Sequence, residues 1–167
     1  MITQELQKIF ARDLGKLKEE IFLYRREEDI WKIEGDITNP AGNLCLHLVG
    51  NLKYFIGGVI GKVDYVRNRD SEFSAKNIRR HELIKMVEET MDVVSYALSE
   101  TTDEQLNEVY PLMVFKEKMS TGYFLMHLAT HLDYHLGQIN YHRRLIAKKP
   151  ENSPKHFDTS IIRSWQK

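Results

Sequence analysis

The chain has 167 residues, of which 42% are hydrophobic. This size allows one domain with a substantial core, and it is too small for two comfortable domains. Lysine plus arginine and aspartate plus glutamate both number 24, and no block of five or six like charges occurs. Such a balance disfavours nucleic acid or an anionic membrane as the main partner, because both attract clustered basic residues.

The remaining composition points to a cytoplasmic protein without a membrane span. The one cysteine, Cys45, excludes an internal disulfide. Residues 1–13 lack the apolar stretch of a secretory signal, and no apolar run approaches the roughly 18 residues that a bilayer-spanning helix requires. We expect Cys45 to be a small buried residue and not a nucleophile.

Apolar residues recur every three or four positions in four segments, which predicts four amphipathic helices. The first segment shows the pattern most clearly, with a stripe from Leu6 through Leu17 to Tyr24. Asn39 and Pro40 resemble a helix start, and Pro150 a helix stop. The predicted helices cover residues 3–26, about 39–57, 79–100 and about 121–147. Residues 63–78 and 101–119 are expected to be irregular connections.

Four such helices without strand alternation predict an all-α four-helix bundle. The long connections allow an order other than a simple up-and-down meander. We expect a single domain at residues 1–149 and a C-terminal tail at 150–167.

Three histidines at intervals of four stand in the last predicted helix, at His127, His131 and His135. This spacing places imidazoles one turn apart on nearly the same face, as a metal ion requires of two ligands on one helix. A lone histidine is more often a surface residue or a hydrogen-bonded core residue. The stripe predicted to face the core contains His131, His135, His142 and Leu145. At two further positions the pattern allows either of two residues, namely His127 or Leu128 and Gln138 or Ile139.

A metal centre in a helical bundle draws ligands from facing helices, and His47 is the histidine of the second helix. It is the natural third ligand. His81 and His156 are predicted to be surface residues. A His-Glu-x-x-His protease site is excluded, because Leu128 and Leu132 occupy the positions where that motif requires glutamate.

Three segments together resemble the DinB-like superfamily: LHLVGNL at 46–52, RDSEF at 69–73 and HLATHLDYHLGQI at 127–139. The superfamily includes bacillithiol and mycothiol S-transferases and mycothiol-dependent maleylpyruvate isomerase. The resemblance implies a DinB-like four-helix bundle in up-down-down-up order, and a homodimer. It also implies a divalent metal ion, zinc or nickel, held by His47, His131 and His135.

In the same resemblance His127 is a neighbour of the ligands, and Leu136 replaces the arginine of the usual His-Arg-Gly-Gln pattern. Three neutral imidazoles leave coordination positions open, so such an ion can lower the pKa of a bound water or thiol. A thiol cosubstrate would then bind as thiolate, ready to attack an electrophile.

The predicted function is therefore a metal-dependent thiol S-transferase, of bacillithiol type, or a hydrolase acting on a small-molecule substrate. The alternative is a non-enzymatic, stress-related protein that binds a metal or ligand. DNA binding is disfavoured by the neutral charge. Side chains near the ligands are candidates for cosubstrate or supporting roles: Asn51, Tyr54 and Gln138 first, then Asp133 and His142.

Overall fold

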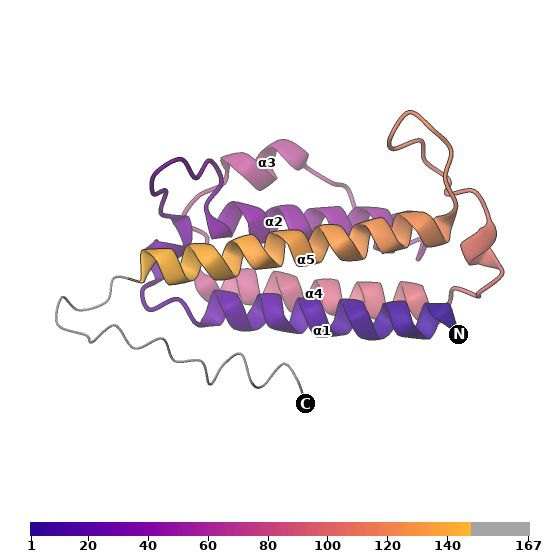
Figure 1. The fold of residues 1–167 in the computed structure, drawn as a ribbon, viewed down its shortest axis with the longest axis horizontal. Coiled ribbons are helices and arrows are strands. Elements are labelled where there is room, and N and C mark those ends of the chain that lie inside the picture. The colour runs from indigo at the N-terminus through magenta and orange to yellow at the C-terminus, as the bar shows by residue number, and fades with distance from the viewer. Residues whose placement is uncertain (148–167) are drawn as a thin grey trace.

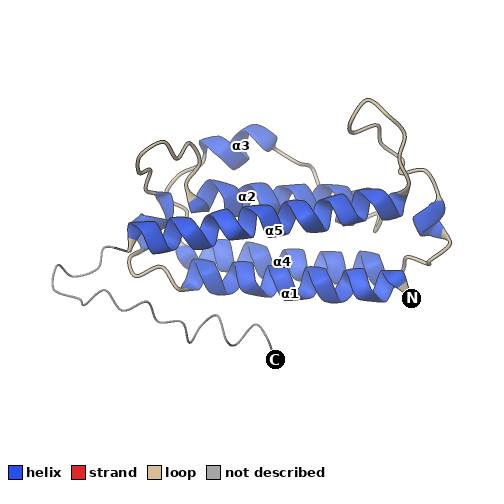
Figure 2. Cartoon of the chain, in the orientation of Figure 1, coloured by secondary structure: helices blue, strands red, loops and turns tan. Residues whose placement is uncertain are grey.

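The computed structural model describes residues 1–147, and these form helices joined by loops without a strand. Four long helices run along the long axis of the molecule (Figure 1), while Figure 2 shows helices and loops only. They are α1 (Ile2–Phe22), α2 (Ala41–Leu52), α4 (Arg80–Ser99) and α5 (Thr121–Ile146). The shorter elements are α3 (Arg69–Ser74), the π-helical turn η2 (Lys53–Gly58) and the 3₁₀ turns η1 (Glu27–Trp31) and η3 (Gln105–Asn107). The predicted all-helical class is confirmed.

Contacts between helix ends show how the long helices run. Arg80, at the start of α4, donates through Nη2 to the Tyr24 carbonyl just after α1, at 2.6 Å. Arg143, in the last turn of α5, pairs with Glu20 near the end of α1, at 2.6 Å. Helices α1 and α5 therefore end on the same side of the molecule, and α4 begins there. Helix α2 contacts both α4 and α5, and α3 packs on α2 at the outside (Figure 1).

The predicted apolar stripes form the core. In α1, Phe10, Leu14 and Ile21 are fully buried, as are Leu48 and Leu52 in α2. In α5 the residues that face the core differ in part from those of the predicted stripe. Phe124, Leu128, Ile139 and His142 of the predicted stripe are buried, whereas His131 and His135 are half-buried and Leu145 is exposed. Leu132, Leu136 and Ile146, which the predicted stripe did not include, are buried as well. The hydrophobic effect favours this rotation, because it buries Leu132 and Leu136 in place of the His131 and His135 imidazoles.

Several predicted boundaries were wrong by a few residues. Helix α1 ends at Phe22, and the residue that caps α2 is Pro40, not Asn39. Helix α3 lies within the segment expected to be irregular, and begins where the Asn68 side chain accepts a hydrogen bond from the Ser71 N–H at 3.1 Å. Its six residues are too few to show periodicity.

Two further predictions concern the chain ends and the membrane. None of the helices among residues 1–147 is long and apolar enough to cross a bilayer. The predicted tail at 150–167, with His156, lies outside the described residues.

Candidate metal centre

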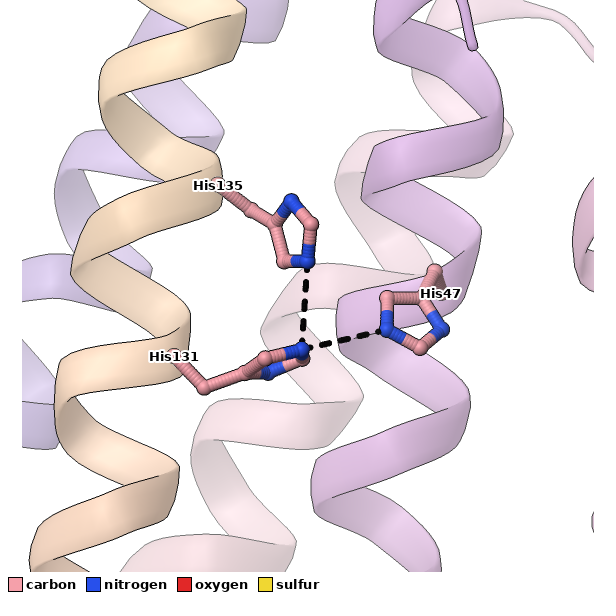
Figure 3. A group of neighbouring side chains, drawn as sticks. All are labelled: His47, His131 and His135. Atoms are coloured by element: carbon pink, nitrogen blue, oxygen red, sulfur yellow. Dashed lines mark hydrogen bonds between the residues drawn. The ribbon is translucent and has the colours of Figure 1, made fainter. Parts of the chain in front are cut away.

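Three imidazoles converge between α2 and α5 (Figure 3). His47 lies in the middle of α2, and His131 and His135 lie one turn apart on α5. The Nε2 atom of His131 is 3.3 Å from Nε2 of His47 and 3.1 Å from Nε2 of His135. One ligand atom from each ring lies within 4.8 Å of the others, so the three histidines could hold a metal ion.

The packing of each helix sets the position of its ring. Almost every residue of α2 is buried, and His47 is only 8% exposed. On α5, Leu132 and Leu136 anchor the helix in the core, which places His131 and His135 at the boundary between core and surface. The cluster is therefore fixed on its inner side and accessible from its outer side.

The outer nitrogen of His47 is held by a buried ion pair. Its Nδ1 lies 2.9 Å from Oε2 of Glu72 in α3, and Glu72 is 5% exposed. Arg67 donates to both oxygens of this carboxylate, from Nε at 2.6 Å and from Nη2 at 2.8 Å. Since a carboxylate accepts hydrogen bonds, Nδ1 of His47 carries the proton, and its Nε2 presents a lone pair to the cluster.

Gly50 makes this arrangement possible. A Cβ at position 50 would overlap the Oε1 atom of Glu72 and lie 2.8 Å from its Cδ. The absence of a side chain on α2 therefore allows α3 to bring Glu72 against the helix, one turn from His47.

His135 has a comparable outer partner in Gln138, whose Oε1 lies 2.7 Å from Nδ1 of His135. With the Nδ1 proton donated to that oxygen, the Nε2 of His135 also presents a lone pair to His131. The Nε2 atom of His131 can donate at most one proton, although it faces the Nε2 atoms of both His47 and His135. Its own Nδ1 is buried and has no hydrogen-bond partner within residues 1–147. Neutral imidazoles alone therefore leave the cluster with facing lone pairs and an unsatisfied nitrogen.

A divalent cation fits this set of donors. Two imidazole nitrogens bound to one zinc ion at about 2.05 Å and at a tetrahedral angle lie about 3.3 Å apart. The observed separations of 3.1 Å and 3.3 Å agree with that value. A cation accepts all three lone pairs, which removes the conflict between His131 and its neighbours.

The environment of the cluster favours neutral rings. Burial, supplemented by the neighbouring His135 and His47, lowers the pKa of His131 to about 4. Burial also lowers the pKa of His47, and this effect outweighs the opposing influence of Glu72. At neutral pH the His47 and His131 imidazoles are therefore in the neutral form that a metal ion binds.

The predicted supporting residues separate into two groups. Gln138 contacts a cluster histidine, as described, and Asn51 lines a hollow of about 530 Å³ together with His47 and His131. Tyr54 lies against Phe55 instead, at 5.0 Å between ring centroids, and it is Phe55 that lines the hollow.

His142 and Asp133 do not join the site. The buried His142 ring accepts a hydrogen bond from Tyr24 Oη through Nδ1 at 2.6 Å and donates through Nε2 to the Lys32 carbonyl at 2.8 Å. It therefore joins α5 to α1 and to the loop after η1. Asp133 is exposed on the outer face of α5.

His127, His81 and Cys45 lie where the sequence analysis expected them. His127 is adjacent to the cluster, 6.0 Å from His131 between ring centroids, and packs against Phe115 at 4.8 Å. His81 is exposed. Cys45 is fully buried, and burial raises the pKa of its thiol to about 12.

Sequence reasoning missed the roles of Arg67, Glu72 and Gly50. Glu72 stands within the RDSEF segment, but nothing in the spacing connects it to a histidine 25 positions earlier. Gly50, in the middle of α2, was a local signal, since a glycine inside a helix can mark a close approach by another element.

A comparison with curated proteins and one with solved structures gave no match. A family model described as a protein of unknown function, DUF1572, matches residues 5–153. Because that match covers most of the length of the chain, the chain belongs to the DUF1572 family.

Proposed function

We propose that the protein binds one divalent transition-metal ion through His47, His131 and His135, and uses it either to transfer a bacillithiol-type thiol to a small electrophilic molecule or to hydrolyse a small molecule. The observation that carries this proposal is the convergence of three Nε2 atoms on a point where neutral imidazoles cannot satisfy one another. Zinc and nickel both suit a set of imidazole ligands.

When bound, such an ion supplies Lewis acidity that lowers the pKa of a water or thiol. The chain's own residues prepare the site. Glu72 and Gln138 accept the Nδ1 protons of His47 and His135, which fixes both rings and directs their Nε2 lone pairs inward. Arg67 holds the Glu72 carboxylate in place by donating two hydrogen bonds to it.

Metal content tests the first half of the proposal. Protein purified without added metal should hold about one zinc or nickel ion per chain by elemental analysis. The His131→Ala variant should lose the ion, whereas His81→Ala, which removes an exposed histidine outside the cluster, should retain it. An unchanged metal content in His131→Ala would contradict the proposed ligand set.

Turnover tests the second half. Bacillithiol should be consumed in the presence of a halogenated bimane by the metal-loaded protein and not by His131→Ala. If the metal binds but no thiol is consumed, the protein is better described as a non-enzymatic metal- or ligand-binding protein. One observation favours that second function: Glu72 is bound by Arg67 and His47, and in the part of the chain that the structure describes no carboxylate lines the hollow to act as a general base.

We also infer that the chain is a DinB-like four-helix bundle in up-down-down-up order, acting in the cytoplasm as a homodimer. The contacts of Arg80 with Tyr24 and of Arg143 with Glu20 support this order, because they place the ends of α1 and α5 beside the start of α4. Sedimentation of the full chain at micromolar concentration tests the dimer, for which a mass near 20 kDa would be contrary evidence.

A further inference from the structure

The hollow beside the cluster has a composition that points to a ligand. It measures about 530 Å³ and reaches His47 and His131 on its inner side. The side chains that decide its chemistry are Asn51, Phe55, Arg67, Arg69, Phe115 and Phe124. They combine an amide, two guanidinium groups and three aromatic rings.

The charge of the hollow is positive. Among residues 1–147, two arginines line it and no aspartate or glutamate does. The charge of Arg67 is balanced by Glu72 behind the wall, at 2.6 Å. Arg69 has no ion pair among residues 1–147, and its guanidinium lies over the Phe73 ring at 5.4 Å. Because a guanidinium matches the geometry of a carboxylate, an exposed Arg69 at the rim favours an anionic group there.

A second observation is independent of charge. Asn51 is 8% exposed, and its Oδ1 atom is buried without a hydrogen-bond partner in the described part of the chain. A buried amide oxygen left unpaired destabilises the protein, because it has lost its hydrogen bonds to water without gaining another. If the Asn51 amide turns its oxygen toward the hollow, a ligand with an N–H or O–H group there would remove this cost, and Asn51 would then select for that group.

The aromatic walls define the rest of the ligand. The Phe55 and Phe124 rings meet edge to face at 5.2 Å, and Phe115 approaches Phe124 at 6.3 Å. Phe115 is 47% exposed, although it packs on His127. An exposed phenylalanine over a hollow gains burial when an apolar group lies against it.

We propose that this hollow binds a small molecule with a carboxylate for Arg69, an N–H or O–H donor for Asn51 and a flat apolar body between Phe55 and Phe115. The inference deepens the proposed function. It rests on that function, because it takes the hollow as the side of the metal centre where the substrate binds. Arg69 and Asn51 are then residues that determine specificity.

Two probes that differ only in the carboxylate test the proposal. N-acetylphenylalanine carries the acid, the N–H and the ring, and N-acetylphenylalanine amide lacks the acid. Calorimetry at neutral pH on the full chain should show the acid binding about tenfold more tightly than the amide, the effect of one charge-assisted hydrogen-bonded pair. Arg69→Gln should remove most of that preference, and Asn51→Ala should weaken both probes alike.

Arg144→Gln is the matched control, because Arg144 is also exposed and lies over a tyrosine ring at 5.8 Å, outside the hollow. It should leave both affinities unchanged. Equal binding of acid and amide, or a preference that survives in Arg69→Gln, overturns the inference. Titrations with and without zinc separate the two proposals. An acid preference in a chain that fails to bind added zinc contradicts the metal centre alone, and a chain that binds zinc but shows no acid preference contradicts this inference alone.

Discussion

The close approach of Glu72 to Gly50 leads to a prediction about a single methyl group. In Gly50→Ala the new Cβ occupies the place of the Glu72 carboxylate, so the carboxylate must move away from α2. That movement breaks its contacts with His47 and Arg67, which are 2.9 Å and 2.6 Å long. The variant therefore leaves a buried charge without its partner, and the His47 ring without its anchor.

The magnitude follows from two opposing effects. Alanine in place of glycine inside a helix stabilises by about 1 kcal/mol. Breaking a buried ion pair costs about 3–5 kcal/mol, and this range applies because the Arg67 and Glu72 side chains are only 11% and 6% exposed. The free energy of unfolding should therefore fall by about 2–4 kcal/mol. Metal affinity should fall roughly 10- to 100-fold, as is usual when the partner of a metal-binding histidine is lost.

Urea unfolding of the metal-free protein measures the first effect, and zinc competition with a chromophoric chelator measures the second. Gly15→Ala is the control, because a Cβ at that position in α1 meets no atom within 4 Å. It should be more stable than wild type by about 1 kcal/mol and bind zinc normally. If Gly50→Ala is as stable as Gly15→Ala and binds zinc as tightly, Glu72 does not support His47 as described.

Three further outcomes are expected. Burial lowers the pKa of His142 below the ordinary histidine value of about 6.5, so the metal-free protein should lose stability as the pH falls below that value. The urea midpoints measured at pH 7.5 and pH 5 should differ less in His142→Gln than in the wild type. Gln138→Ala should weaken zinc about tenfold in the chelator assay but change the urea midpoint little, because Gln138 is exposed. The Cys45 thiol, buried and with its pKa raised to about 12, should react with an aromatic disulfide reagent only in urea; rapid labelling of the native protein would contradict its burial.

Much of the helical structure could be predicted, because each long helix carries its own apolar stripe. Phe10 and Leu14 in α1 and Leu48 in α2 are buried as their spacing indicates. The rotation of α5 was harder, since leucines and histidines occupy adjacent positions there and periodicity alone supports either face. Burial of Leu128 and Leu132 decided it.

The convergence of the three histidines could also be anticipated, from one local repeat and one distant residue. The support of His47 by Glu72 could not, because it depends on a six-residue helix without a periodic signal and on the missing side chain of Gly50. Tyr54 was expected beside His47 from α-helical geometry, but the chain enters a π-helical turn at Lys53, and Phe55 faces the hollow instead.

The distance along the chain between His47 and the other two histidines has a consequence for how the protein is made. A nascent chain that has reached Ser120 contains His47 and Glu72 but neither His131 nor His135, so it offers a metal ion one imidazole of the cluster. High affinity can arise only after α5 has been synthesised and has closed against α2. Metal capture should therefore coincide with the last folding step, and an ion held there would resist the detachment of α5 from the earlier helices.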